Sequence, residues 1–193
     1  ARVYEDVLGV ERAIATLRIA REATGREDAL ALEMGDLFAV TGAVDSAVEE
    51  WATAIGEDEG QAAGIVRRIE ELEDGKENAG RQLVDYLAKS GILAHQRVGA
   101  RIALDLGLEE AALDLSRRVA KDLEGRSREM ILAEVGRRAR ETGLSLAASW
   151  AYEELGRGAS TPSERRQFDQ RIIDVALAAG DTAAALEAQR RVA

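Results

Sequence analysis

The chain has 193 residues, of which 46% are hydrophobic, 32% charged and 4% aromatic, and it contains one proline and no cysteine. These proportions are typical of a folded protein, and the lack of cysteine excludes disulfide bonds and thiolate metal sites. The formal net charge of −10 at pH 7 disfavours binding to nucleic acid or to an anionic membrane surface, because both would be repelled. Residues 1–100 carry 11 basic and 20 acidic side chains, so nearly all of the net negative charge lies there.

A glycine recurs between two runs of helix-forming residues along the whole chain. The positions are Gly9, Gly42, Gly75, Gly107, Gly143 and Gly180, at intervals of 33, 33, 32, 36 and 37 residues. Such periods are typical of repeat architectures. We therefore interpret residues 1–193 as a single helical repeat array in a segment of a longer protein. Its approximate units are 1–25, 26–59, 60–91, 92–125, 126–160 and 161–193, of which the first and the last can be truncated.

Within these units the pattern is helical. In residues 44–55 apolar side chains recur at i, i+3, i+4, i+7, i+8 and i+11, which makes one apolar stripe on a helix. Residues 62–72 contain a second stripe. The run Thr161-Pro162-Ser163-Glu164 is a capping box, with Thr161 as N-cap and Pro162 as the first helical residue. No stretch alternates like a strand, so we expect eleven or twelve antiparallel helices of about 10–16 residues.

Small and aromatic residues repeat together over a longer interval. Gly35, Gly42, Ala47 and Trp51 recur 101 residues later as Gly136, Gly143, Ala148 and Tyr152. Where two helices cross closely, only a small residue lets the backbones approach. We therefore expect Gly35 to face Ala47, and Gly136 to face Ala148, with Phe38 and Trp51 beside the first crossing. The turn glycines are expected to adopt a left-handed conformation.

These residues resemble a known repeat. The run Met34-Gly35-Asp36-Leu37-Phe38, followed by Gly42, Ala47, Trp51 and Ala54, resembles the tetratricopeptide repeat (TPR). Val135, Gly136, Gly143, Ala148 and Tyr152 match it less fully, with Ala139 in the place of the first aromatic residue and Leu155 in that of the last alanine. Units of 36 and 37 residues also fit Sel1-like or other helical repeats, which share the architecture. The resemblance implies an all-α, right-handed superhelical solenoid of about six helix pairs.

The resemblance also implies a concave face lined by the first helix of each pair, which binds a protein or peptide. By alignment, the residues on this face are Leu32, Asp36, Ala39, Val40, Ile65, Ile69, Leu72, Gln96, Arg137 and Arg140. The N-terminal part of this face is apolar and the C-terminal part is cationic. Two alternatives remain open: Ile65, Ile69 and Leu72 can pack between repeats, and the two arginines can pair with Glu134 or Glu141. The lysines and asparagines with which chaperone-binding members clamp a C-terminal carboxylate are missing.

The sequence contains no glycine-rich phosphate loop, HExxH motif or nucleophile elbow, and we expect no catalysis, cofactor or metal site. The acidic run at residues 70–74 lacks the spacing of a calcium loop and indicates a solvated turn. We expect a non-catalytic scaffold that binds a peptide or helix of a partner on the concave face. The alternative is a structural segment that sets spacing or forms a homo-oligomer. Since no apolar run reaches membrane-spanning length, we expect a soluble segment, with the cytoplasm considered before the periplasm.

Overall fold

The computed structural model describes residues 9–26, 28–55 and 59–192. Over these ranges the chain is all-α, with eleven α-helices, one short 3₁₀ helix and no strand. The expected fold class and number of helices are therefore confirmed. Residues 1–8, which make up the start of the first expected unit, lie outside the described residues.

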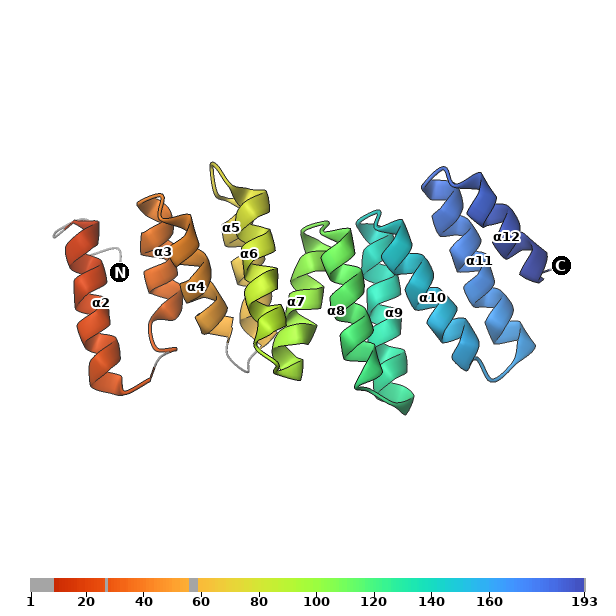
Figure 1. Cartoon of the computed structure of the whole chain (residues 1–193), viewed down its shortest axis with the longest axis horizontal. Coiled ribbons are helices and arrows are strands. Elements are labelled where there is room, and N and C mark those ends of the chain that lie inside the picture. Colours follow the sequence, from red (N-terminus) through yellow and green to blue (C-terminus); the bar gives the residue numbers. More distant parts are fainter. Residues whose placement is uncertain (1–8, 27, 56–58, 193) are drawn as a thin grey trace. The chain divides into compact units, whose positions relative to one another are not determined.

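Figure 1 shows the helices in chain order. They are α2 (Val10–Thr24), α3 (Ala31–Val40), α4 (Val44–Ile55), η1 (Glu59–Gln61), α5 (Ala62–Glu70), α6 (Lys76–Lys89), α7 (Leu93–Asp105), α8 (Glu109–Lys121), α9 (Gly125–Glu141), α10 (Ser145–Gly158), α11 (Pro162–Ala178) and α12 (Thr182–Val192).

A glycine with positive φ lies in the turns that the sequence singled out. Gly42, between α3 and α4, has φ = +76°, and Gly143, between α9 and α10, has φ = +77°. A residue with a Cβ atom is strained in this left-handed region, whereas glycine is not. The backbone N–H of the residue after each glycine donates to a carbonyl in the last turn of the preceding helix, from Ala43 to Phe38 and from Leu144 to Ala139. These turns reverse the chain and produce helical hairpins.

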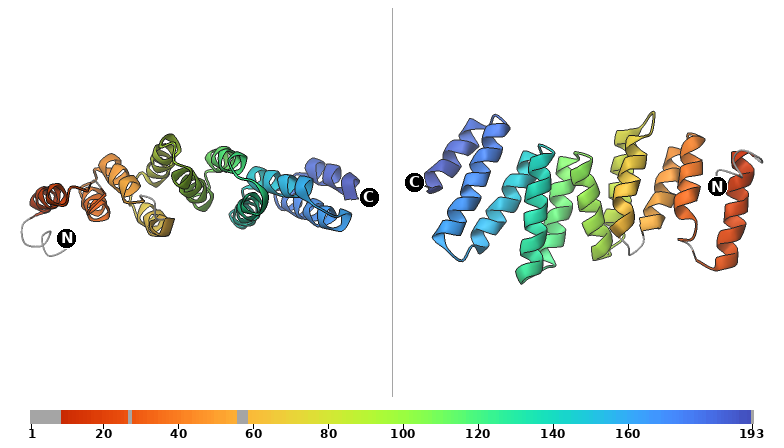
Figure 2. Two further views of the ribbon diagram at one scale, coloured as in Figure 1. Left: turned by 90° about the horizontal axis from the view of Figure 1, so that it is seen from below. Right: turned by 180° about the vertical axis from the view of Figure 1, so that it is seen from behind.

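The chain forms two compact units, residues 1–102 and residues 103–193. In the first, α3 packs against α2 and α4, and α6 packs against α4 and α5. In the second, α10 packs against α8, α9 and α11, and α12 packs against α11. Figure 2 shows these hairpins from two further directions. In both units the second helix of one hairpin contacts the second helix of the next, α4 with α6 and α8 with α10, so each unit has a helical repeat fold.

The core lies at the crossings within hairpins. Ala47 and Ala148 are fully buried, and the large rings of Trp51 and Tyr152 are almost as enclosed. A Cβ atom on Gly35 would lie 3.1 Å from the carbonyl oxygen of Ala47, and closer still to Trp51. At the second crossing the atoms nearest to such a Cβ on Gly136 belong to Tyr152 and not to Ala148. Both crossings are therefore built from a glycine and an aromatic ring.

Phe38 does not share that crossing. It packs against a cluster formed by Ala13, Ile14 and Leu37, between α2 and α3. Phe38 follows Gly35 by three residues, so it points about 60° away from it around the helix. This rotation directs the ring toward α2, and our expectation that Phe38 lies beside Trp51 is corrected accordingly.

Candidate protein-binding groove

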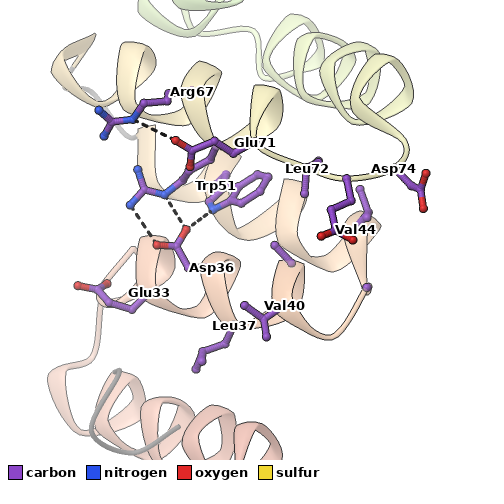
Figure 3. Close-up of a pocket in the computed structure, with 14 residues that line it drawn as sticks. Glu33, Asp36, Leu37, Val40, Val44, Trp51, Arg67, Glu71, Leu72 and Asp74 are labelled. Carbon is purple, nitrogen blue, oxygen red and sulfur yellow. Dashed lines mark hydrogen bonds and ion pairs between the residues drawn. The ribbon is translucent and has the colours of Figure 1, made fainter. Parts of the chain in front are cut away.

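The first unit contains a groove between its helices, with a volume of about 970 Å³. One wall is α3, the other is the last part of α5 with the turn that follows it, and Trp51 and Val44 of α4 close the bottom (Figure 3). Of the residues expected on the concave face, Asp36, Ala39, Val40 and Leu72 line this groove. The structure thus brings together residues from two consecutive sequence repeats.

The apolar side chains of the groove, which we call its floor, are those of Val40, Val44 and Leu72, and they are partly open to solvent. Val40 is 64% exposed, while Val44 and Leu72 are half-buried. In Figure 3 Val44 and Leu72 lie at the same end of the groove as Asp74. Leu37 and Trp51 also line the groove and are buried. A single exposed aliphatic residue is common on protein surfaces, but Val40 lines the same groove as Val44 and Leu72 and so adds to one apolar surface that a partner could cover.

A network centred on Asp36 joins the two walls. Arg68 of α5 donates from Nε to Oδ1 of Asp36 at 2.6 Å and from Nη2 to Oδ2 at 3.0 Å. Nε1 of Trp51 donates to the same Oδ1 at 3.1 Å. The pair from Arg68 is therefore bidentate, which is the geometry in which a guanidinium group binds a carboxylate most strongly. The hydrogen bond that Arg68 donates to Asp36 raises the pKa of Arg68 above its ordinary value, so the guanidinium stays charged. The network fixes the spacing between α3 and α5.

The rim of the groove carries more acid than base. Its lining contains five carboxylates and two guanidinium groups, and Asp36 already binds one of the latter. The other guanidinium, that of Arg67, lies 3.9 Å from a carboxylate oxygen of Glu71, and both side chains are about 70% exposed. A pair so open to solvent contributes little. Glu33, Glu73 and Asp74 are exposed and make no ion pair with other described residues, so the groove is negative overall.

Two residues expected on the concave face require correction. Ile65 and Ile69 are fully buried and cannot touch a partner. They belong to the inward-facing stripe of α5, together with Ala62 and Val66. Since α5 is amphipathic, burial of this stripe turns Arg67 and Arg68 toward the groove side of the helix. The structure has the alternative arrangement, in which these isoleucines pack between helices.

The remaining expected residues lie away from the groove. Leu32 on α3 and Gln96 on α7 are half-buried. Arg137 and Arg140 are exposed on α9 in the second unit, where Arg137 binds Glu141 at 2.6 Å. The two arginines therefore belong to a different unit from the one that contains the groove.

Sequence reasoning missed the arginines that join consecutive first helices. Arg68 of α5 binds Asp36 of α3, and in the second unit Arg138 of α9 binds Asp105 of α7 at 2.6 Å. The partners are 32 and 33 residues apart, which is one repeat length. A search for opposite charges separated by one period would have found both pairs.

Neither a metal site nor a membrane span is found in the described ranges. No three His, Cys, Asp or Glu side chains there are grouped so that they could hold a metal ion. None of the helices described is both long and apolar enough to cross a membrane. His95 is half-buried near the start of α7.

Comparisons with known proteins give one weak similarity. No family model and no curated protein matches the chain. Among solved structures, the chain is similar to PilW, described as a widely conserved type IV pilus biogenesis factor, with 14% sequence identity and a TM-score of 0.35. The alignment covers 99% of this chain and 88% of that chain. Similarity this low assigns neither a family nor a function, so the functional argument depends on the groove itself.

Proposed function

We propose that this chain is a non-catalytic protein-binding module of the tetratricopeptide type, in which the groove of the first unit takes a peptide or helix from a partner protein. The observation that carries this proposal is Val40, an aliphatic side chain 64% exposed inside a groove of about 970 Å³. Its floor continues over Val44 and Leu72. Burying this apolar surface under a partner is favourable, at about 25 cal/mol per Å² removed from water.

The walls of the groove favour a protein segment as the occupant. Both α3 and α5 satisfy their own backbone hydrogen bonds, so they offer no free strand edge to an extended chain. An occupant must bind through side chains, as an amphipathic helix does with residues at i, i+3 and i+4. A short peptide that inserts one or two apolar side chains would use the same floor.

The polar groups of the groove fit a binding role better than catalysis. Asp36 is the most enclosed carboxylate of the lining, and both of its oxygens accept hydrogen bonds from Arg68. These bonds use Asp36 to join α3 to α5. We therefore assign Asp36 to positioning the walls and not to proton transfer.

The test is selection of a displayed library of random peptides on the whole chain, followed by binding measurements with variants. Peptides selected on the wild type should bind Val40→Glu about tenfold more weakly, because a charge on the floor must be desolvated. The matched control is Ile19→Glu, which changes an equally exposed aliphatic residue on α2, outside the groove. Circular dichroism should show that both variants fold.

The proposal fails if no peptide is enriched, or if the enriched peptides bind Val40→Glu as tightly as the wild type. Equal losses with Val40→Glu and Ile19→Glu would place the binding surface outside the groove, and this would also contradict the proposal.

A second candidate is self-association through the second unit. Leu177 on α11 and Leu186 on α12 are 57% and 62% exposed, and two copies could bury these side chains against each other. Sedimentation velocity over a range of concentrations tests this candidate. A dimer that Leu186→Glu dissociates would support it, whereas a monomer at all concentrations would exclude it.

A further inference from the structure

The acidic rim of the groove identifies the chemistry of its occupant. We infer that the groove of the first unit takes a basic amphipathic segment, in which lysine or arginine flanks at least one large apolar side chain. This inference rests on the proposed function, because it names the class of partner for the same groove. It goes beyond that function in requiring a particular charge on the partner.

The first step is the distribution of charge along the groove. In Figure 3 Glu33 and Arg67 lie at one end and Asp74 at the other. The end with Arg67 is mixed in charge, because Arg68, Asp36 and Glu71 also line the groove and Arg68 is bonded to Asp36. At the opposite end Glu73 and Asp74 lie in the turn beyond α5, and both are exposed. This second end is purely acidic.

The second step is the position of these acids relative to α5. The helix ends at Glu70, and its last carbonyl groups give that terminus a partial negative charge. Glu73 and Asp74 lie three and four residues beyond Glu70, in the turn that leads to α6. They directly precede Gly75, the N-cap of α6, where acidic side chains are favourable, and both remain exposed on the rim of the groove. Lys76 begins α6 beyond the turn and does not line the groove.

The third step is the proximity of the acidic end to the apolar floor. Asp74 lies beside Val44 and Leu72, so an apolar side chain on the floor and a cation at the rim can belong to one short segment (Figure 3). An acidic segment would be repelled here, and a neutral one would leave the carboxylates without a partner. A cationic side chain of the partner is attracted to Glu73 and Asp74, and this attraction steers the partner to the groove from solution.

The test uses the peptides selected on the wild-type chain in the library experiment above. Groove-dependent peptides, defined as those weakened by Val40→Gln, which removes the apolar side chain without adding an acid to the groove, should contain more lysine and arginine than aspartate and glutamate. The most enriched peptide is then synthesised in two forms, as selected and with each lysine and arginine replaced by glutamine. The selected form should bind about tenfold tighter at low salt, and the difference should shrink as salt screens the charges.

The matched variants place the charge effect on the rim. Glu73→Gln combined with Asp74→Asn should weaken the selected peptide about fivefold and leave the glutamine form nearly unchanged. The control combines Glu49→Gln with Asp85→Asn, two exposed acids of the same unit that do not line the groove. It removes the same net charge and should alter binding less than about twofold.

The outcomes separate this inference from the proposed function. Groove-dependent peptides that are neutral or acidic, or that bind equally well after the glutamine replacements, would overturn the basic occupant and leave the binding module standing. Equal effects of the rim and control variants would also overturn the inferred basic occupant, since the net negative charge of the whole unit would then explain the preference for basic peptides. An absence of groove-dependent peptides would overturn the proposed function itself.

Discussion

Gly35 lies directly against the indole ring of Trp51, so that a Cβ atom at residue 35 would be 2.4 Å from Cδ1 and 2.6 Å from Nε1 of the ring. The same relationship recurs 101 residues later, where a Cβ atom on Gly136 would lie 2.7 Å from Cε1 of Tyr152. In each hairpin an aromatic ring of the second helix fills the space that a side chain would need on the first. Gly35 and Gly136 are therefore required by packing and not by backbone conformation.

Gly35→Ala should consequently destabilise the first unit by about 1–3 kcal/mol, because its methyl group must displace the ring of Trp51. Urea unfolding followed by circular dichroism measures this change. The control is Gly64→Ala within α5, where the nearest atom to an added Cβ is Nη1 of Arg68 at 3.4 Å, an ordinary van der Waals distance. There alanine should leave stability unchanged or raise it by up to about 1 kcal/mol. Equal unfolding midpoints for Gly35→Ala and the wild type would contradict the packing argument.

The side chains of Asp36 and Arg68 should be energetically coupled. A double-mutant cycle with Asp36→Ala and Arg68→Ala is expected to give about 0.5–1.5 kcal/mol, since the bond is two-pronged and Arg68 is three-quarters buried. The same cycle for Arg67 and Glu71, a more exposed pair, should give a coupling energy near zero. If both cycles give the same value, the network is no more than a surface ion pair.

Ser116 on α8 is fully buried, and its hydroxyl has no hydrogen-bond partner among the described residues. Ser116→Ala should raise the free energy of unfolding by about 0.5–1 kcal/mol, because it removes an unsatisfied polar group and introduces the better helix former. Ser149→Ala, at a half-buried position on α10, provides the comparison and should change stability less. A loss of stability with Ser116→Ala would show that the hydroxyl has a partner in solution.

Asp169 on α11 is buried, and Nε of Arg191 on α12 lies 3.3 Å from its Oδ1. Arg191→Ala should therefore cost about 1–3 kcal/mol, because the carboxylate loses its partner inside the helix pair. Thermal unfolding compares this variant with Arg190→Ala, which removes the neighbouring exposed arginine. Equal melting temperatures for the two variants would show that the bond does not hold α12 in place.

Features that depend on local sequence could be predicted. The turn glycines, the apolar stripes and the number of helices follow from interactions between residues close in the chain. The capping box is an example, since the backbone N–H of Glu164 donates to Oγ1 of Thr161 as expected. Its second bond differs, because Oε2 of Glu164 accepts from the backbone N–H of Ser160, outside the cap residue. That choice depends on the path of the chain into the helix.

Features that depend on neighbouring helices could not be predicted in this way. Periodicity assigned Ile65 and Ile69 to one face of α5, but it could not tell whether that face meets another helix or solvent. The alignment placed Asp36 on the concave face without indicating that Arg68, one repeat later, binds it. The direction of Phe38 toward α2 depends in the same way on a helix outside its own hairpin.

Because Nε1 of Trp51 is bonded to Asp36 and the ring lines the groove, the groove contains its own fluorophore. The other tryptophan, Trp150, belongs to the second unit and can be replaced by phenylalanine to isolate the emission of Trp51. A ligand that displaces water around Asp36 changes the field at the indole and hence the wavelength of its emission. Occupancy of the groove can therefore be followed on the unlabelled chain from the fluorescence emission of Trp51.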